Sequence, residues 1–331
     1  MSLKPILPHI KYRQRRETSM SQLENRRSLR TITLEEHFAI PAFLKALAPH
    51  QRNNTELVAQ LCDLDERRIA DMDAAGIDMQ VLSLTAPGVE QLETAEAVAL
   101  ARETNERLAE TIRRHPSRFA GFASLPTMTP EVAANELERT IREYGFKGAM
   151  INGHTHGRYL DDEFFWPILE RADALQVPIY LHPTPPPQPV IAASYTGNFA
   201  PELIPVLASS AWGWHIETAT HILRIVLSGA FDRYPNLQFV IGHMGEALPF
   251  MLSRIEMALP ADMTKLQRPI GAYFRENLHY TFGGFNWTQT FLDLLLQVGT
   301  DRIMFSADYP YRSMEWAHTF LDQLPVSPAD K

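Results

Sequence analysis

Thr33-Leu-Glu-Glu-His-Phe38 is the stretch on which the interpretation of the whole chain depends. The run 31–35 has the apolar, β-branched character of a short buried strand, and ligand-type side chains stand at its end. Because side chains alternate between the two faces of a strand, we expect Glu35 and His37 on one face and Glu36 on the other. A carboxylate and an imidazole arranged in this way are able to share one metal ion.

Seven further strand-like runs follow this one, and amphipathic stretches typical of helices separate them. Eight strands alternating with about eight helices predict an α/β fold, a (β/α)8 or TIM barrel. The main alternative is an open doubly wound sheet, which would usually carry a glycine-rich turn where this chain has Glu35-Glu36-His37. The seven runs are 79–85, 119–125, 148–152, 178–182, 239–243, 278–282 and 303–307.

The composition of the 331 residues is that of an ordinary globular protein, with 45% hydrophobic and 21% charged residues. Charge is spread unevenly along the chain. Residues 1–30 carry eight Lys or Arg and two Glu, whereas residues 31–331 carry 23 Lys or Arg and 37 Asp or Glu. An acidic body argues against nucleic acid as a partner. No apolar run reaches 18 residues, which predicts no membrane span. The single cysteine, Cys62, leaves no intramolecular disulfide and fits a cytoplasmic location.

The chain divides by pattern into a short extension and one large domain. Residues 1–30 lack apolar periodicity and are predicted to form a flexible basic N-terminal extension, with mitochondrial targeting as an open alternative. Residues 31–331 are predicted to form a single metal-dependent barrel domain that carries the catalytic site. Seven prolines fall between Pro183 and Ala211, which predicts a long irregular loop that forms a stiff wall, a lid or a subunit contact.

Ligand-type side chains stand where several of the predicted strands end. The carboxyl ends of the strands share one rim of a barrel, and active sites lie on that rim. A lone histidine or an Asp before Tyr-Pro is usually structural, but five such coincidences on one rim favour a metal site. Two imidazoles and two carboxylates suit Zn2+ or Mn2+. The residues are Glu35, His37, His182 and Asp308 as ligands, and His243 as a fifth ligand or a neighbouring catalyst.

Motifs spread over residues 31–322 carry a resemblance to a known family. They are Leu34-Glu-Glu-His-Phe-Ala-Ile-Pro41, Asp71-Met-Asp-Ala-Ala-Gly-Ile-Asp78, Leu82-Ser-Leu-Thr-Ala-Pro-Gly88, Gly157-Arg-Tyr-Leu-Asp161, Tyr180-Leu-His-Pro183, Glu217-Thr218, Gly242-His-Met-Gly-Glu246 and Asp301-Arg-Ile-Met-Phe-Ser-Ala-Asp308. Together they resemble the amidohydrolase superfamily, in its branch of metal-dependent non-oxidative decarboxylases. That branch includes gamma-resorcylate, 2,3-dihydroxybenzoate and 5-carboxyvanillate decarboxylases. It carries Glu-x-His in place of the more usual His-x-His, as Glu35-Glu36-His37 does here.

The resemblance implies one divalent metal ion per subunit, Zn2+ or Mn2+, and a role for each site residue. Glu35, His37, His182 and Asp308 would bind the metal, Asp308, His243 and Glu246 would be catalytic, and Thr85 and Arg254 would bind substrate. For Thr85 and Arg254 a strand-end hydroxyl and a salt-bridged helix residue remain equal alternatives. His154 and His156 are further candidates for substrate contact, whereas nothing requires His215 to lie near the metal.

The resemblance also implies the reaction, the substrate and the assembly. The expected substrate is a small aromatic carboxylic acid with an ortho hydroxyl, whose ring carbon is protonated before CO2 leaves, with Asp308 as the proton donor. The alternatives are a metal-dependent hydrolase of a lactone, amide or related carbonyl compound, and a barrel that only binds a ligand. Relatives are commonly homodimers or homotetramers. Many carry a further C-terminal helix beyond the position of Lys331, and a chain without it is expected to depend more on its oligomer.

Overall fold

The computed structural model describes residues 30–47 and 54–331. The predictions of a flexible extension or a presequence over residues 1–30 lie outside the described residues, apart from Arg30. The compact unit is Thr31–Lys331. None of the helices in the described part of the chain is long and apolar enough to cross a membrane.

All pairings between the strands of the described chain are parallel, and neighbouring strands follow one another in sequence. Only Phe122 separates β3 from β4, and its N–H donates to the Leu82 carbonyl (2.9 Å), so these two strands occupy one position in the barrel. The Leu34 N–H donates to the Phe305 carbonyl (3.1 Å) and thereby joins the first strand to the last. The strands are β1 (Ile32–Phe38), β2 (Met79–Leu84), β3 (Phe119–Gly121), β4 (Ala123–Ser124), β5 (Ala149–Asn152), β6 (Ile179–His182), β7 (Phe239–Ile241), β8 (Leu278–Thr281) and β9 (Ile303–Met304).

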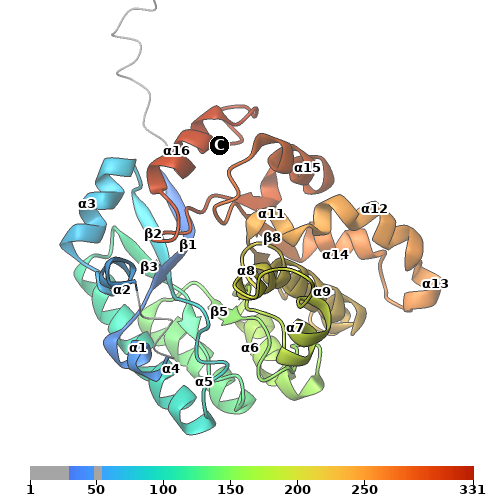
Figure 1. Ribbon diagram of the computed structural model, residues 1–331, viewed down its shortest axis with the longest axis horizontal. Helices are drawn as coiled ribbons and strands as arrows, with labels where there is room; N and C mark the ends of the chain where they lie inside the picture. Colours follow the sequence, from blue (N-terminus) through green and yellow to red (C-terminus); the bar gives the residue numbers. More distant parts are fainter. Residues whose placement is uncertain (1–29, 48–53) are drawn as a thin grey trace, which may run out of the picture. The chain divides into compact units, whose positions relative to one another are not determined.

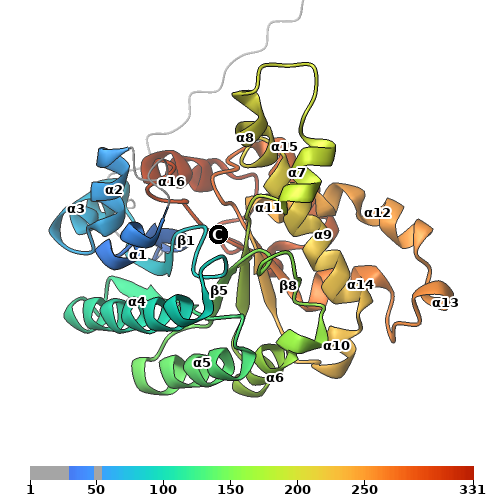
Figure 2. The ribbon, with the colours of Figure 1, turned by 60° about the horizontal axis from the view of Figure 1, so that its bottom comes forward.

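Helices surround these strands, as Figures 1 and 2 show, so the predicted (β/α)8 barrel is confirmed. Local sequence explains where several helices begin and end. Pro130 stands in the first turn of α5, where a missing N–H costs nothing, and α3 and α5 end at the left-handed glycines Gly76 and Gly145. The helices are α1 (Pro41–Ala46), α2 (Thr55–Cys62), α3 (Glu66–Ala75), α4 (Thr94–Arg114), α5 (Pro130–Tyr144), η3 (Glu163–Phe165), α6 (Trp166–Leu175), α7 (Gln188–Ser194), α8 (Leu203–Ala208), α9 (Gly213–Leu227), α10 (Ala230–Arg233), α11 (His243–Glu246), α12 (Leu248–Ala258), α13 (Ala261–Thr264), α14 (Ile270–Glu276), α15 (Thr288–Val298), η4 (Thr300–Arg302) and α16 (Met314–Gln323).

The apolar core has two parts, which is the arrangement that a closed barrel requires. The larger part lies between strands and helices. The smaller part comes from side chains on β2 to β7, with Phe122 and Tyr180 as its largest members, and it packs as one cluster inside the barrel. This packed interior forms the floor beneath the polar strand ends.

The proline-rich segment between Pro183 and Ala211 is more ordered than the sequence predicted. It folds into two short helices, α7 and α8, and Figure 2 shows it rising at one end of the barrel. The expectation of an irregular segment therefore holds for residues 183–187, 195–202 and 209–211 and is wrong for the two helices. The physical reason is that proline is tolerated in the first turn of a helix, where Pro189 stands in α7.

Candidate active site

The end of β1 is not a regular strand. Glu35 has a left-handed backbone (φ 64°), and the pairing of β1 with β2 shifts register between Thr33 and Glu36. Glu35 and His37 nevertheless reach the same site, whereas Glu36 turns away from it. The predicted partition of the three side chains therefore agrees with the structure, but a bulge at Glu35 accompanies it in place of simple alternation.

Glu35, His37 and His182 bring their ligand atoms within 4.8 Å of one another. Asp308 joins them, since its Oδ1 lies 3.4 Å from His37 Nε2. Glu35 Oε1 and both ring nitrogens of His37 are buried and have no hydrogen-bond partner among the described residues. Because buried polar atoms without partners are costly, this donor set fits a cation that the four residues would hold together.

The electrostatics of these ligand atoms also suit a cation. Burial raises the pKa of Glu35, because enclosing a carboxylate is costly, and the nearby His243 and His37 offset this only in part. Burial, with His37 and His243 nearby, holds the pKa of His182 well below its usual range, so its imidazole is neutral and able to bind a metal. The His182 Nδ1 lies 2.9 Å from the Pro183 carbonyl, which leaves Nε2 directed to the site, 3.8 Å from Glu35 Oε1.

Glu36 supports the site from behind, a role that the sequence did not reveal. Its carboxyl oxygens accept from the backbone N–H groups of Ala307 (2.9 Å) and Tyr309 (3.2 Å), which flank Asp308. Burial raises the pKa of Glu36 to about 8 in spite of these two bonds. Adjacent residues of β1 therefore serve the site in different ways, because Glu36 fixes the turn that presents Asp308.

The segment that carries His243 and Glu246 is a left-handed turn. Residues 243–247 all have positive φ angles, between 50° and 92°, although only Gly245 is a glycine. Such backbone costs of order 1–3 kcal/mol per residue and persists only where its surroundings enforce it. The turn places His243 Nδ1 2.7 Å from Glu246 Oε1, and both side chains are buried.

His215, at the start of α9, shares Glu246 with His243. Its Nδ1 lies 2.5 Å from Glu246 Oε2, and its Nε2 lies 3.1 Å from the indole nitrogen of Trp214 and 3.0 Å from the Ser210 carbonyl. Sequence reasoning did not place His215 here, because the topology rule that groups strand ends does not extend to helices.

The charges of this trio balance one another. Burial would raise the pKa of Glu246, but His243 and His215 outweigh it, so its pKa is lowered and it remains a carboxylate. Burial would lower the pKa of His243, but Glu246 and Glu35 raise it to about 9. Since a carboxylate only accepts, each Nδ1–H donates to Glu246, and the Nε2 of His243 is left for another partner.

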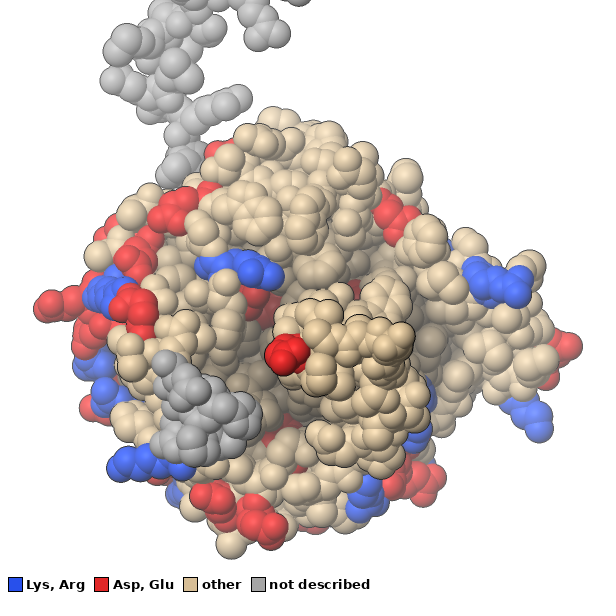
Figure 3. All heavy atoms as spheres, viewed as in Figure 1, with Lys and Arg blue, Asp and Glu red and all other residues tan. Residues whose placement is uncertain are grey.

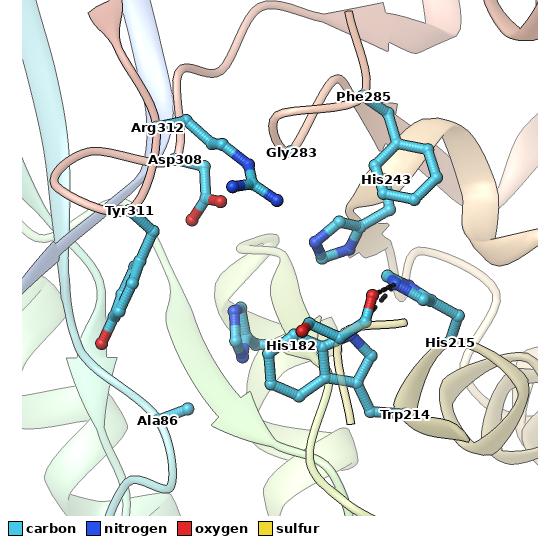
Figure 4. A pocket seen from close by; sticks show the side chains of 11 residues that line it. Ala86, His182, Trp214, His215, His243, Gly283, Phe285, Asp308, Tyr311 and Arg312 are labelled. Carbon is cyan, nitrogen blue, oxygen red and sulfur yellow. Dashed lines mark hydrogen bonds between the residues drawn. The ribbon is translucent and has the colours of Figure 1, made fainter. Parts of the chain in front are cut away.

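A pocket of about 300 Å³ opens between two groups of side chains. One is the trio of His215, His243 and Glu246, and the other, called the metal-type cluster below, consists of Glu35, His37, His182 and Asp308. Figure 4 shows His182, His243 and Asp308 around the pocket, with the aromatic side chains of Trp214, Phe285 and Tyr311 placed among them. In the space-filling view of Figure 3 the molecular surface is hollowed near the centre of the picture. The lining residues are Ala86, His182, Ser210, Trp214, His215, His243, Gly283, Phe285, Asp308, Tyr311 and Arg312.

The two predicted substrate contacts occupy different places. Thr85 is buried, and its hydroxyl lies 2.6 Å from that of Tyr311, so it stands behind a wall of the pocket. Arg254 lies exposed on α12 and does not line the pocket that the described residues form. His154 and His156 also lie outside its lining; their Nε2 atoms contact the carbonyls of Pro185 and Leu92 (3.2 Å each).

The fold and these side chains define a class of protein, a barrel enzyme with one metal-type site that combines two histidines with two carboxylates at its strand ends. The family model described as amidohydrolase matches residues 46–331. The chain therefore belongs to the amidohydrolase family.

Several relatives within that family share one activity. A gamma-resorcylate decarboxylase from Polaromonas sp. (strain JS666) is 39% identical, over 91% of this chain and 94% of the relative. A solved 2,6-dihydroxybenzoate decarboxylase, in complex with 2,6-dihydroxybenzoate, is 37% identical, with a TM-score of 0.82, over 91% and 94% of the two chains. A solved dihydroxybenzoic acid decarboxylase from Polaromonas sp. JS666, with manganese and the inhibitor 2-nitroresorcinol, is 39% identical, with a TM-score of 0.82, over 91% and 92%. The predicted resemblance to metal-dependent hydroxybenzoate decarboxylases is confirmed.

Proposed function

We propose that this protein removes CO2 from a small aromatic acid that carries a hydroxyl ortho to the carboxylate, and that Glu35, His37, His182 and Asp308 hold its metal ion. One observation carries the proposal: buried metal-type atoms without partners lie beside a pocket with aromatic walls. A planar, negatively charged substrate fits such a pocket, because aromatic side chains cover its ring faces.

The order of bond changes follows from the substrate. Direct loss of CO2 would leave an aryl anion, so the ring carbon is protonated first and the C–C bond breaks afterwards. When bound, the metal ion would act as a Lewis acid and would orient the carboxylate and the ortho oxygen of the substrate. Asp308 is the proton donor to the ring carbon, since it lies at the pocket and beside the metal-type atoms.

The proton count defines what the other residues do. One substrate carboxylate and one proton give one neutral product ring and CO2, so each turnover consumes a proton. Glu246 fixes the His243 ring through Nδ1, and His243 Nε2 is then able to stabilise the negative charge that the ring oxygen carries. Aromaticity returns when CO2 leaves.

Mn2+ is the metal that we propose in preference to Zn2+. Manganese is bound in the solved dihydroxybenzoic acid decarboxylase from Polaromonas sp. JS666. A donor set with two carboxylates is also harder in character than the thiolate- or imidazole-rich sets typical of zinc. Metal analysis of the purified protein, followed by removal and return of each ion, distinguishes the two.

The reaction is tested by ultraviolet spectra and CO2 release with a panel of hydroxybenzoates and simple lactones. We expect CO2 from at least one ortho-hydroxy acid and no opening of any lactone. Lactone opening without CO2 release would instead support the hydrolase, in which the same metal site activates water. Binding without turnover of either class would support a barrel that only binds its ligand.

The proposed assembly is a homodimer or homotetramer. Several large apolar side chains on α12, α13 and α15 are exposed, among them Phe250 (76%), Met257 (66%) and Leu296 (84%). Exposed apolar side chains that lie together on a surface are typical of protein contacts. Light scattering after size-exclusion chromatography gives the mass, and Phe250→Asp with Met257→Asp should yield monomers if this face is the contact.

A further inference from the structure

Arg312 is the single Lys or Arg that lines the pocket formed by residues 30–47 and 54–331, and the proposed chemistry does not use it. Its backbone N–H donates to the Asp308 carbonyl (2.9 Å), so the two side chains come from one turn. Figure 4 shows its guanidinium inside the pocket, between the Asp308 carboxylate and the His243 ring in this view.

The Arg312 side chain occupies space that a side chain at Gly284 would otherwise fill. A Cβ atom at Gly284 would lie 2.7 Å from Arg312 Cγ, 3.3 Å from its Nε and 3.3 Å from Asp308 Oδ2. Gly284 also has a positive φ angle (74°), which other residues rarely adopt. A larger residue here would push Arg312 aside, so the loop after β8 is shaped to let the guanidinium reach the pocket.

The guanidinium of Arg312 has no hydrogen-bond or ion-pair partner among the residues that the structure describes. Several other arginines of the described chain are paired, among them Arg224 with Asp161 and the buried Arg68 with the carbonyl oxygens of Asp63 and His37. A guanidinium offers five donors in a fixed plane that matches a carboxylate. Arg312 is exposed to solvent and also lines the pocket, and an unpaired guanidinium in such a place is suited to an anionic ligand.

The chemistry of decarboxylation decides which anion this is. In the proposed function the metal ion already takes the reacting carboxylate together with the ortho oxygen, so Arg312 is left for another anionic group. A charged group that does not react keeps its charge throughout, and a cation on it favours binding without slowing the reaction. Arg312 is therefore better suited to bind a charged group of the substrate that does not react.

We propose that Arg312 binds a second, non-reacting carboxylate, so that the substrate is an ortho-hydroxy aromatic acid with a further acidic substituent. The proposal rests on the proposed function and narrows its substrate class. The metal-type cluster would take the reacting carboxylate with its ortho oxygen, the aromatic walls would take the ring, and Arg312 would take the second acid group.

The kinetic test compares diacids with their amides. The metal-loaded enzyme is assayed with 4-hydroxyisophthalate and 2-hydroxyterephthalate, and with the two compounds in which the carboxylate remote from the hydroxyl is a carboxamide. In Arg312→Gln, KM for at least one diacid should rise by about tenfold, the loss of one charge-assisted contact at an accessible site, with kcat unchanged. KM for the amides should change little. Arg312→Lys should restore part of the loss.

A matched control and a binding measurement complete the design. The control is Arg113→Gln, which removes the charge of an exposed arginine in the last turn of α4. This variant should have the kinetic constants of wild type. The unreactive pair 4-hydroxy-3-nitrobenzoate and 4-hydroxy-3-nitrobenzamide is titrated by calorimetry into wild type and Arg312→Gln. We expect Kd of the acid alone to weaken, by about tenfold.

Two results would overturn the proposal. An equal rise in KM for diacids and amides, or a fall in kcat, would mean that Arg312 acts on the reacting carboxylate. An acid-to-amide affinity ratio that is the same in wild type and Arg312→Gln would exclude a second acid subsite. If no ortho-hydroxy acid releases CO2, the proposed function fails, and the calorimetric ratio still decides whether Arg312 binds an acid.

Discussion

Two clusters of buried polar side chains face the pocket, and they differ in how their hydrogen bonds are completed. In the cluster of Glu35, His37 and His182, the carboxylate Oε1 and both nitrogens of His37 lack partners among the described residues. In the trio of His215, His243 and Glu246, both carboxylate oxygens are bonded to imidazoles.

Either cluster has the composition and spacing of a metal site. Composition alone therefore does not identify a metal site. The unsatisfied cluster fits an ion, whereas the trio is complete by itself and is suited to hold His243 in a fixed orientation.

The largest expected effect separates the two clusters by metal content. Glu35→Gln and His182→Ala should each lose the bound ion and reduce turnover by more than the 10–100-fold typical of changes to the partner of a ligand. Glu246→Gln, the control in the trio, should keep its metal. Elemental analysis of the purified variants with rate measurements checks this, and metal loss from Glu246→Gln alone would reverse the assignment.

The next effect concerns Asp308, which belongs to the unsatisfied cluster and also faces the substrate. Asp308→Asn retains an oxygen ligand but carries no acidic proton, so turnover should fall by about a thousandfold while part of the metal stays bound. Rates normalised to metal content measure this loss. A variant that turns over normally for each bound ion would contradict the role of Asp308 as proton donor.

The sequence predicted the cluster at the strand ends because one rule of topology sufficed. In a parallel barrel the strands all end on one rim, so an apolar run that ends in Glu, His or Asp already places that side chain. Glu35, His37, His182 and Asp308 stand together for this reason.

The strand-end rule also placed His243, but it could not predict His215 or Arg312, since the positions of these two depend on tertiary detail. His215 opens a helix, and its contact with Glu246 requires a left-handed turn over residues 243–247 that no local preference favours. Thr85 matched a substrate-binding position by motif but is covered by Tyr311. The reach of Arg312 depends on Gly284, 28 residues earlier in the sequence.

A smaller effect tests how the trio works. His243→Gln removes the imidazole that faces the pocket and should lower kcat by about a hundredfold with metal retained. His215→Asn leaves that imidazole but frees Glu246 Oε2, and the expected loss is about tenfold, within the range for a supporting partner. His215 is a positioning residue in this account, so its variant should lower kcat with little change in KM. Equal losses in the two variants would contradict this division of roles.

The smallest effect on activity is expected at Glu90, a buried carboxyl outside both clusters. Its Oε1 accepts from the Asn152 backbone N–H (2.8 Å), and its Oε2 has no partner among the described residues. Burial raises its pKa from 4.5 to about 7. Unlike Glu246, it is not bonded to an imidazole among the described residues.

The raised pKa of Glu90 makes stability depend on pH. Between about pH 4.5 and 7 the folded carboxyl keeps its proton while the unfolded one has lost it, so the folded state binds more protons. The free energy of unfolding should therefore fall as pH rises through this range, by at most on the order of 3 kcal/mol for this group. In Glu90→Gln this contribution is absent.

Urea unfolding of wild type and Glu90→Gln at pH 5 and pH 8 measures the contribution of this carboxyl, with Glu103→Gln as an exposed control on α4. Relative to Glu90→Gln, wild type should be less stable at pH 8 than at pH 5, whereas the Glu103→Gln difference should stay constant. A Glu90→Gln difference that does not vary with pH would mean that Glu90 has found a partner for its charge. Glu90 would then resemble the satisfied trio more closely than an unpaired buried acid.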